Sequence, residues 1–280
     1  MAKFYVCRHC GNLIGMIHDA GVPIICCGEK MEELEQLQQT LQAEGIQTRL
    51  SPHLFAVDGV RSASAKQRAQ DLMSFYLDPQ TDAVFDCSGG DIANEILPYL
   101  DYAAIARSRK PFWGYSDLTC VLNAIYTMTG NAGVLYQIRH YQPEQRDTLF
   151  AFPYSFIQGN QMEGIVVGGN IRCLLKLAGT RYFPNLQGKI LFLEARSGLE
   201  PQMIAFLSQL QQLGAFDAVN GILLGTFTHL ERHRSQPAIE QLIMDFVSPE
   251  LPIAKTPSIG HAPDSRALVI GRPMQLKQQP

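Results

Sequence analysis

Residues 111–130 read "PFWGYSDLTCVLNAIYTMTG", and this stretch decides which fold the sequence predicts. The apolar run through Trp113 predicts a strand, Gly114 predicts a turn, and the residues after Ser116 predict a helix. Ser116 itself has two interpretations. The first is a helix N-cap, because serine oxygens accept hydrogen bonds from the free N–H groups of a first turn. Alternatively it is a nucleophile, raised on a sharp turn between a strand and a helix.

The same order of elements recurs on the N-terminal side of this stretch. Helices are predicted at residues 31–45 and 64–78, and strands at residues 46–51 and 82–87. The second of these strands ends in Gly89 and Gly90, and a helical segment follows. Repeated strand, glycine turn and helix predict parallel βαβ units, in which chemistry gathers at the carboxyl ends of the strands. Gly90 and Ser116 both occupy such ends.

The second half of the chain is richer in strands. The stretch "EGIVVGGNIRCLLKLAGT" at 163–180 is glycine-rich, and "GKILFLEA" at 188–195 and "VNGILLGTF" at 219–227 read as buried strands. A helix is predicted between the last two. The sequence therefore indicates an α/β protein with two domains: an N-terminal one with a parallel sheet flanked by helices, and a smaller, β-rich α/β one. The boundary is expected between about residues 140 and 163.

Composition excludes several classes of function. The chain has 280 residues, 46% of them hydrophobic and 18% charged, with a formal net charge of -3. This balance gives no basic surface for nucleic acid, and no apolar run is long enough to span a membrane. The first ten residues lack the apolar core of a signal peptide, so the expected compartment is the cytoplasm. In that compartment, seven cysteines favour metal ligands or buried thiols over disulfides.

A serine nucleophile needs a base and a group that orients the base. Among the seven histidines, His261 stands in an irregular turn after an apolar run, with Gly260 before it and Ala262 after it. From its position alone, a structural histidine is an equal alternative. Glu194 ends an apolar strand, where a buried carboxylate is costly without a partner. A histidine N–H is one such partner.

The residues from about 32 onward resemble the LD-carboxypeptidase and microcin-immunity family of serine peptidases. The matching stretches are "SGGDIANEILPYLDY", "KPFWGYSDLTCVLNAIY", "GGNIRCLLKLAGTRYFPNLQGKILFLE", "GILLGTF" and "IGHAPDSRALVIGRP". The resemblance implies a Ser-His-Glu triad of Ser116, His261 and Glu194. It also implies an oxyanion hole formed by the backbone N–H groups of Gly90 and Asp117. An N-terminal domain at 32–150 would carry the serine, and a C-terminal domain at 163–280 the glutamate and histidine.

The resemblance leaves the substrate open. Typical members release the terminal D-alanine of a murein tetrapeptide, whereas a subgroup hydrolyses peptidyl-nucleotide antibiotics and so confers immunity. "SGGDIANEILPYLDY" is closer to the immunity type than to the "RGG" of typical carboxypeptidases. We expect an LD-type serine carboxypeptidase that acts on a small murein peptide, with no nucleic-acid or membrane partner. A homodimer is compatible with the sequence.

A second constellation lies at the N-terminus. Cys7 and Cys10 have the C-x-x-C spacing, and Cys26 and Cys27 follow after fifteen residues. Four thiolates in a short glycine-rich knuckle suit tetrahedral iron or zinc. Residues 1–34 resemble the desulforedoxin-like domain that opens desulfoferrodoxins, which binds one iron through four cysteines at these positions. The expected metal-binding segment is residues 1–31, and hydrolysis is expected to need no cofactor.

Two departures from these families stand out. The superoxide-reducing domain that normally follows a desulforedoxin-like segment is missing, so superoxide reduction is not expected. The first peptidase strand, roughly "GDxIxxVAPS", is also missing, and either "VPIICC" replaces it or the sheet lacks it. An iron-binding redox protein with a remnant peptidase half is therefore the alternative from another functional class.

Overall fold

The computed structural model describes residues 34–54, 61–233 and 237–278, together with the backbone of five short strands in the first 33 residues. These strands are β1 (Lys3–Val6), β2 (Leu13–Met16), β3 (Ile25–Cys26), β4 (Glu29–Lys30) and β5 (Glu32–Glu33). Of the four predicted metal ligands, Cys7, Cys10 and Cys27 lie outside the described residues, as does the side chain of Cys26. The metal site therefore stays a prediction.

The N-terminal domain is built on a four-stranded sheet with the order β14-β8-β7-β6. Its parallel strands are β6 (Val84–Phe85), β7 (Phe112–Gly114) and β8 (Gly133–Leu135). The helical elements of this part are α1 (Leu34–Ala43), α2 (Ala65–Leu77), η1 (Ala93–Tyr99), α3 (Tyr102–Ser108), η2 (Ser116–Leu118), α4 (Thr119–Thr129), η3 (Ile138–His140) and η4 (Pro143–Thr148). Ser64 caps α2 by accepting a hydrogen bond from the N–H of Gln67.

The C-terminal domain is built on a six-stranded sheet with the order β15-β10-β11-β12-β13-β9. Its strands are β9 (Ser155–Gln158), β10 (Gln161–Asn170), β11 (Lys189–Ala195), β12 (Gly221–Phe227), β13 (Ile253–Lys255) and β15 (Pro273–Lys277). The four central strands are parallel and the two edge strands are antiparallel. Its helical elements are α5 (Ile171–Leu175), α6 (Glu200–Gln212), α7 (Ala215–Ala218), α8 (Thr228–Arg232), α9 (Ile239–Leu242) and η5 (Ile243–Asp245).

The predicted fold class is confirmed, but one predicted element is wrong. Residues 46–51 form no strand. A strand needs a neighbouring backbone to pair with, and side chains in this segment are bound by helical neighbours instead. Thr48 accepts a hydrogen bond from Gln38 of α1, and Arg49 pairs with Asp78 at the end of α2 at 2.7 Å. Within the described ranges, no helix has both the length and the apolar character needed to cross a bilayer.

Both faces of the six-stranded sheet are buried. Odd-numbered residues of β11 face one hydrophobic core, and even-numbered residues face the other. Leu191 and Leu193 pack with the side chains of α6 and α9 in one core. Ile190 and Phe192 pack in the other core, which also contains residues of β7 and α4 from the N-terminal domain. Successive side chains of a strand point to opposite faces, so residue 194 lies on the face that meets the N-terminal domain.

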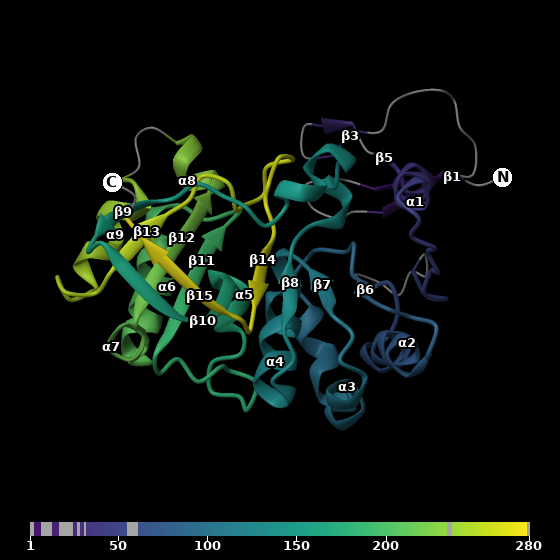
Figure 1. Cartoon of the computed structure of the whole chain (residues 1–280), viewed down its shortest axis with the longest axis horizontal. Coiled ribbons are helices and arrows are strands. Elements are labelled where there is room, and N and C mark those ends of the chain that lie inside the picture. The colour runs from purple at the N-terminus through teal and green to yellow at the C-terminus, as the bar shows by residue number, and fades with distance from the viewer. Residues whose placement is uncertain are drawn as a thin grey trace.

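The C-terminal part of the chain connects the two sheets, because its last two strands pair with different sheets. Strand β14 (Leu268–Ile270) follows β13 in sequence but pairs antiparallel with β8 of the other sheet, and β15 then returns to pair with β10. Figure 1 shows β14 beside β8, at the edge of the four-stranded sheet that is nearest the six-stranded sheet. The segment between β13 and β14, which carries His261, is therefore held by one sheet at each end.

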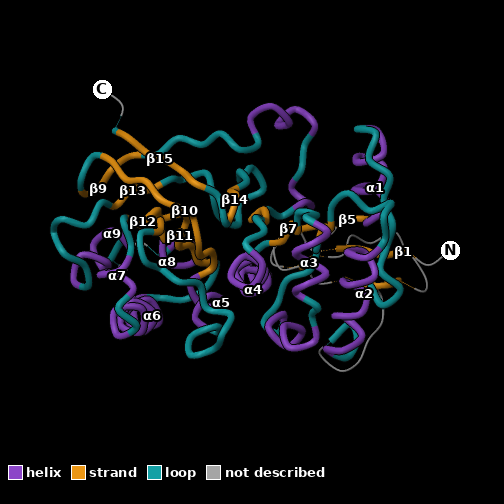
Figure 2. Tube along the Cα trace, turned by 60° about the horizontal axis from the view of Figure 1, so that its bottom comes forward, coloured by secondary structure: helices purple, strands orange, loops and turns teal. Residues whose placement is uncertain are grey.

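The domains also meet where α4 packs on the end of β10, and Figure 2 shows α4 between the two sheets. Gly169 permits this close approach to α4, whereas a Cβ on Gly168 would collide with the backbone of β11 at the Phe192 carbonyl oxygen. Gly168 and Gly169 have φ of +106° and +141°, and a Cβ on Gly169 would lie 2.5 Å from Thr119 Oγ1. The buried Asn123 of α4 bonds both the N–H and the C=O of Gly168, each at 2.9 Å.

We expect Gly169→Ala to lower the free energy of unfolding by more than about 2 kcal/mol, because the added methyl pushes α4 away from β10 in addition to straining the backbone. Gly214→Ala is the matched control. Its φ is +68° and nothing lies within 4 Å of an added Cβ, so only the left-handed backbone penalty of about 1 kcal/mol applies. Urea unfolding of both variants measures the difference. Equal losses would contradict a tight contact between α4 and β10.

Candidate active site

Ser116 occupies a strained turn at the carboxyl end of β7. Its φ is +55°, a left-handed conformation that costs a residue with a side chain about 1–2 kcal/mol. The turn is tight, because a Cβ on Gly114 would lie 2.6 Å from Leu118 Cβ. The N-cap of η2 is Tyr115 and that of α4 is Leu118, so the N-cap interpretation of Ser116 is wrong. The geometry is that of a serine raised between a strand and a helix.

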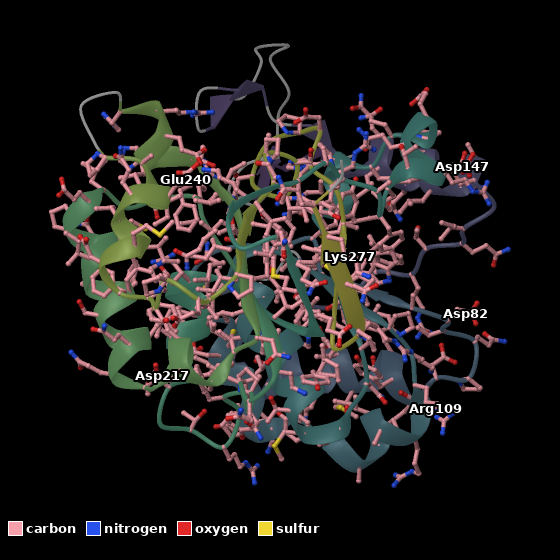
Figure 3. The ribbon with its side chains drawn as sticks, turned by 60° about the vertical axis from the view of Figure 1, so that its left-hand side comes forward. Asp82, Arg109, Asp147, Asp217, Glu240 and Lys277 are labelled. Carbon is pink, nitrogen blue, oxygen red and sulfur yellow. The ribbon has the colours of Figure 1, made fainter. Side chains whose placement is uncertain are left out.

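Glu194 is the most deeply buried carboxylate among the residues that the structure describes. Carboxylates such as Asp82, Asp147 and Asp217 lie at the surface, as Figure 3 shows. Glu194, at the end of β11, is 0% exposed. An ionised carboxylate in such a place costs several kcal/mol unless other groups compensate it. The surroundings of Glu194 are therefore expected to contain dedicated partners.

Asn170 and His261 both contact the Glu194 carboxylate. Asn170, its register partner at the end of the neighbouring strand β10, donates from Nδ2 to Oε1 at 3.0 Å. His261 places Nδ1 2.9 Å from Oε2, which is within ion-pair distance although the ring N–H is not aligned on that oxygen as a hydrogen bond. The predicted base and the predicted orienting acid are thus brought together, 67 residues apart in sequence.

His261 is 4% exposed and lies on the segment that joins the two sheets. Its second ring nitrogen, Nε2, is buried and has no hydrogen-bond partner among the described residues. The ring contacts Tyr115 edge-on, with centroids 4.8 Å apart. Burial and the neighbouring Glu194 carboxylate raise the pKa of Tyr115 well above its ordinary value. The residue before Ser116 therefore packs directly on the histidine and glutamate pair.

The two predicted oxyanion donors lie at neighbouring strand ends. Gly90 follows β6 and has a φ of +126°, which favours glycine even though an added Cβ would have open space. Asp117 is in the first turn of η2, where backbone N–H groups lack partners inside the helix. The Asp117 carboxylate binds the loop after Gly90, because Oδ2 accepts the N–H of Ala93 at 2.7 Å.

Sequence reasoning missed the polar side chains that support these residues. Asn170 holds Glu194, and its own N–H donates to Thr119 Oγ1 at 2.9 Å. Lys176 binds Asp117 Oδ1 at 2.6 Å. In the sequence, the role of Asn170 is indicated only by its place after two glycines at the end of a buried strand. Glu194 was noted because it too ends a buried strand.

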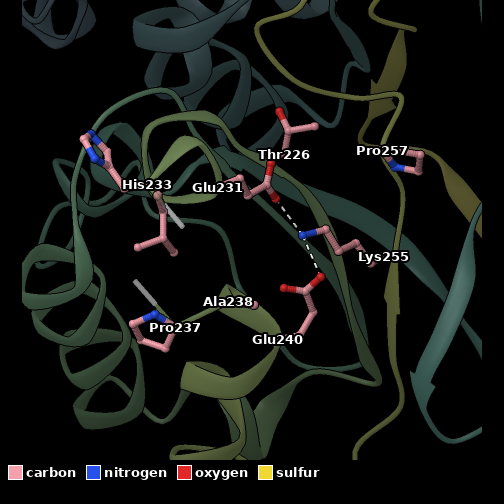
Figure 4. Close-up of a pocket in the computed structure, with 9 residues that line it drawn as sticks. Thr226, Glu231, His233, Pro237, Ala238, Glu240, Lys255 and Pro257 are labelled. Atoms are coloured by element: carbon pink, nitrogen blue, oxygen red, sulfur yellow. Dashed lines mark hydrogen bonds and ion pairs between the residues drawn. The ribbon is translucent and has the colours of Figure 1, made fainter. Parts of the chain in front are cut away.

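A pocket of 370 Å³ lies near the carboxyl ends of β12 and β13, beside the segment that carries His261 (Figure 4). Lys255 pairs there with Glu231 at 2.6 Å and with Glu240 at 2.8 Å. None of Ser116, Glu194 and His261 lines this pocket. Its lysine is already neutralised by two carboxylates, so Lys255 is not a free cation for an anionic ligand.

The sequence matches known domains over most of its length. Residues 22–137 match the LD-carboxypeptidase N-terminal domain, and residues 163–276 match the LD-carboxypeptidase C-terminal domain. The first match begins at residue 22 and so includes Cys26 and Cys27. The segment expected to bind metal thus overlaps the matched peptidase domain.

Individual relatives carry two kinds of name. A probable murein peptide carboxypeptidase of Bacillus subtilis (strain 168) is 27% identical over 285 residues, which cover 93% of this chain and 87% of that protein. The microcin C7 self-immunity protein MccF of Escherichia coli is 26% identical over 215 residues, which cover 60% of this chain and 62% of that protein. A solved muramoyltetrapeptide carboxypeptidase from Oxalobacter formigenes shares the fold, with a TM-score of 0.74 and 22% identity over 88% of this chain and 90% of that one.

A fluorophosphonate probe tests the predicted nucleophile without any assumption about the substrate. We expect the wild-type protein to be labelled at Ser116 and Ser116→Ala to be unlabelled. His261→Ala should slow labelling by about 10⁴-fold or more, and Glu194→Gln by less, because the members of a triad act as a unit. Ser197→Ala, which alters an exposed serine near Glu194, is the control and should label normally. Mass spectrometry that locates the adduct on another residue would contradict this assignment.

Proposed function

The chain belongs to the LD-carboxypeptidase family, and we propose that it is a serine carboxypeptidase of the LD type. Its substrate is a small murein peptide, from which it releases the C-terminal D-alanine. The observation that carries the proposal is the buried Glu194–His261 pair, packed on the residue that precedes the strained Ser116 turn. The matches to the N- and C-terminal domains of the family support it.

The proposed reaction has two steps. Ser116 Oγ attacks the carbonyl carbon of the last peptide bond while His261 Nε2 accepts the hydroxyl proton. The oxygen that becomes negative is bound by the N–H groups of Gly90 and Asp117. The C–N bond then breaks, the histidine returns its proton to the leaving amine, and D-alanine departs. Water, activated by the same histidine, hydrolyses the acyl-enzyme and regenerates Ser116.

Glu194 has a defined part in this scheme. Its carboxylate lies against His261 Nδ1 and so stabilises the imidazolium that forms when Nε2 takes the proton. The hydrogen bond from Asn170 satisfies the other carboxylate oxygen. Both contacts come from the C-terminal domain, whereas the serine and the two N–H donors come from the N-terminal domain.

A peptide panel analysed by mass spectrometry tests the substrate. We expect a murein tetrapeptide with an L,D terminal bond to lose D-alanine, and an all-L tetrapeptide to react much more slowly. Equal rates on the two peptides would contradict the LD-type assignment. The relative MccF makes a peptidyl-nucleotide conjugate the third member of the panel, and selective hydrolysis of that conjugate would favour the immunity type instead.

An exopeptidase also needs a group that recognises the terminal carboxylate, and we propose Arg196 for this role. Arg196 directly follows β11 and lies two residues after Glu194, in the bend at the carboxyl end of that strand. Its Nη1 is buried and has no hydrogen-bond partner among the residues that the structure describes. A guanidinium fits a carboxylate through two parallel hydrogen bonds.

Arg196→Gln is expected to raise KM about 10- to 100-fold for the tetrapeptide with a free terminal carboxylate, because a charge-assisted hydrogen bond is lost. The same peptide with a terminal carboxamide should show little further change. Arg232→Gln, which alters an exposed arginine of α8, is the matched control and should leave KM unchanged. If Arg196→Gln affects the acid and the amide equally, Arg196 does not bind the carboxylate.

A further inference from the structure

Lys176 makes a set of hydrogen bonds that joins three parts of the fold. Its Nζ lies 2.6 Å from Asp117 Oδ1, 2.9 Å from Asp91 Oδ1 and 2.7 Å from the Asp91 carbonyl oxygen. An ammonium group has three N–H donors, so these contacts use its full capacity. Arg172, one turn earlier on α5, adds a second cation on Asp91 at 2.6 Å.

The residues that Lys176 binds adjoin the two predicted oxyanion donors. Asp91 directly follows Gly90, and Asp117 carries the other donor on its own backbone. The second oxygen of the Asp117 carboxylate accepts the N–H of Ala93 at 2.7 Å, so the loop after β6 and the turn after β7 are tied to each other and to one ammonium group. The Asp117 side chain is 3% exposed, which limits competition from water for the bonds of its carboxylate, whereas the Asp91 side chain is 53% exposed.

Lys176 remains charged in this environment. Partial burial alone would lower its pKa, but the hydrogen bonds to Asp117 and Asp91 outweigh burial and raise the pKa above its ordinary value. The partner carboxylate behaves accordingly. Partial burial opposes the shift, yet the hydrogen bonds from Lys176 and Arg172 lower the pKa of Asp91. Around neutral pH the Lys176 ammonium and the Asp91 carboxylate are therefore both fully charged.

Helix α5 connects this contact to the other half of the site. Its N-cap is Asn170, which donates to Glu194, and its C-cap is Lys176. A helix of five residues between these caps has little freedom to bend. One end of α5 thus holds the acid of the proposed triad, and the other end holds the segments that carry both N–H donors.

We propose that Lys176 is the positioning residue of the oxyanion hole: it fixes the separation and direction of the Gly90 and Asp117 N–H groups from the C-terminal domain. This inference rests on the proposed serine mechanism. Lys176 itself is placed on the carboxylates behind the donors and need not touch the substrate. Its effect should therefore appear in the chemical step, where the negative oxygen forms, and not in substrate binding.

Three variants separate position from charge. We expect Lys176→Met to lower kcat on the tetrapeptide about 10- to 100-fold with KM nearly unchanged, because small displacements of a preorganised donor cost rate. Lys176→Arg keeps the charge and should restore most of the rate, and Lys176→Gln should fall between the two. Lys255→Met is the matched control, since Lys255 also bridges two carboxylates of the same domain but lies away from Gly90 and Asp117.

Thermal unfolding of the same variants excludes a general loss of structure. The proposal is supported if Lys176→Met loses rate while its melting temperature falls no further than that of Lys255→Met. It is overturned if the rate loss follows the melting temperature, or if KM changes and kcat does not. Should Lys176→Met fail to fold, Lys176→Gln and Lys176→Arg carry the comparison, and equal rates in both would overturn the proposal.

The labelling rate of Ser116 by a fluorophosphonate distinguishes failure of this inference from failure of the proposed substrate. The attack on phosphorus also places negative charge on an oxygen in the hole, so Lys176→Met should slow labelling even if no murein peptide is cleaved. A wild-type protein that is labelled but inactive on the tetrapeptide refutes the substrate alone. Unchanged labelling in Lys176→Met refutes the role of Lys176 alone.

Discussion

The constraint on which the rest of this structure depends is the burial of the Glu194 carboxylate between two domains. A charged group with no exposure is tolerated only where other groups compensate it. Here Asn170 donates a hydrogen bond to one carboxylate oxygen, and the His261 ring lies within ion-pair distance of the other. Each comes from a different element, one from the neighbouring strand and one from the connection between the sheets. The carboxylate therefore couples the ends of β10 and β11 to the path of the chain after β13.

That coupling is effective because the chain crosses between the sheets twice more after β13. After β13 it leaves the six-stranded sheet, passes His261, and adds β14 to the four-stranded sheet before β15 returns. The histidine is thus anchored to the sheet that carries Ser116 as well as to the one that carries Glu194. An interface closed in this way resists relative displacement of the domains, which is what a site assembled from two domains requires.

The interface depends on a close contact between α4 and the end of β10, where the strand has glycines in place of residues with side chains. Gly169 lets α4 approach β10 so closely that the side-chain amide of Asn123 bonds both the N–H and the C=O of Gly168. Thr119, at the start of α4, accepts the N–H of Asn170, the residue that holds Glu194. The helix that follows Ser116 and the strand end that supports the acid are consequently parts of one buried polar network, in which every bond replaces one lost to water.

The sequence alone determined the order of strands, glycine turns and helices, because periodicity and turn chemistry are local, and it singled out Ser116, Glu194 and His261 as unusual within their segments. It wrongly predicted a strand at residues 46–51, since apolar and β-branched residues cannot reveal whether a partner strand exists. The resemblance to a family supplied the grouping of the three residues and the two N–H donors. Only the tertiary structure decided that Glu194 meets His261, that Ser116 has a left-handed backbone, and that Asn170 and Lys176 stand behind them. These contacts join residues 24 to 67 positions apart, and such proximity follows from how sheets pack and cross, which no local pattern encodes.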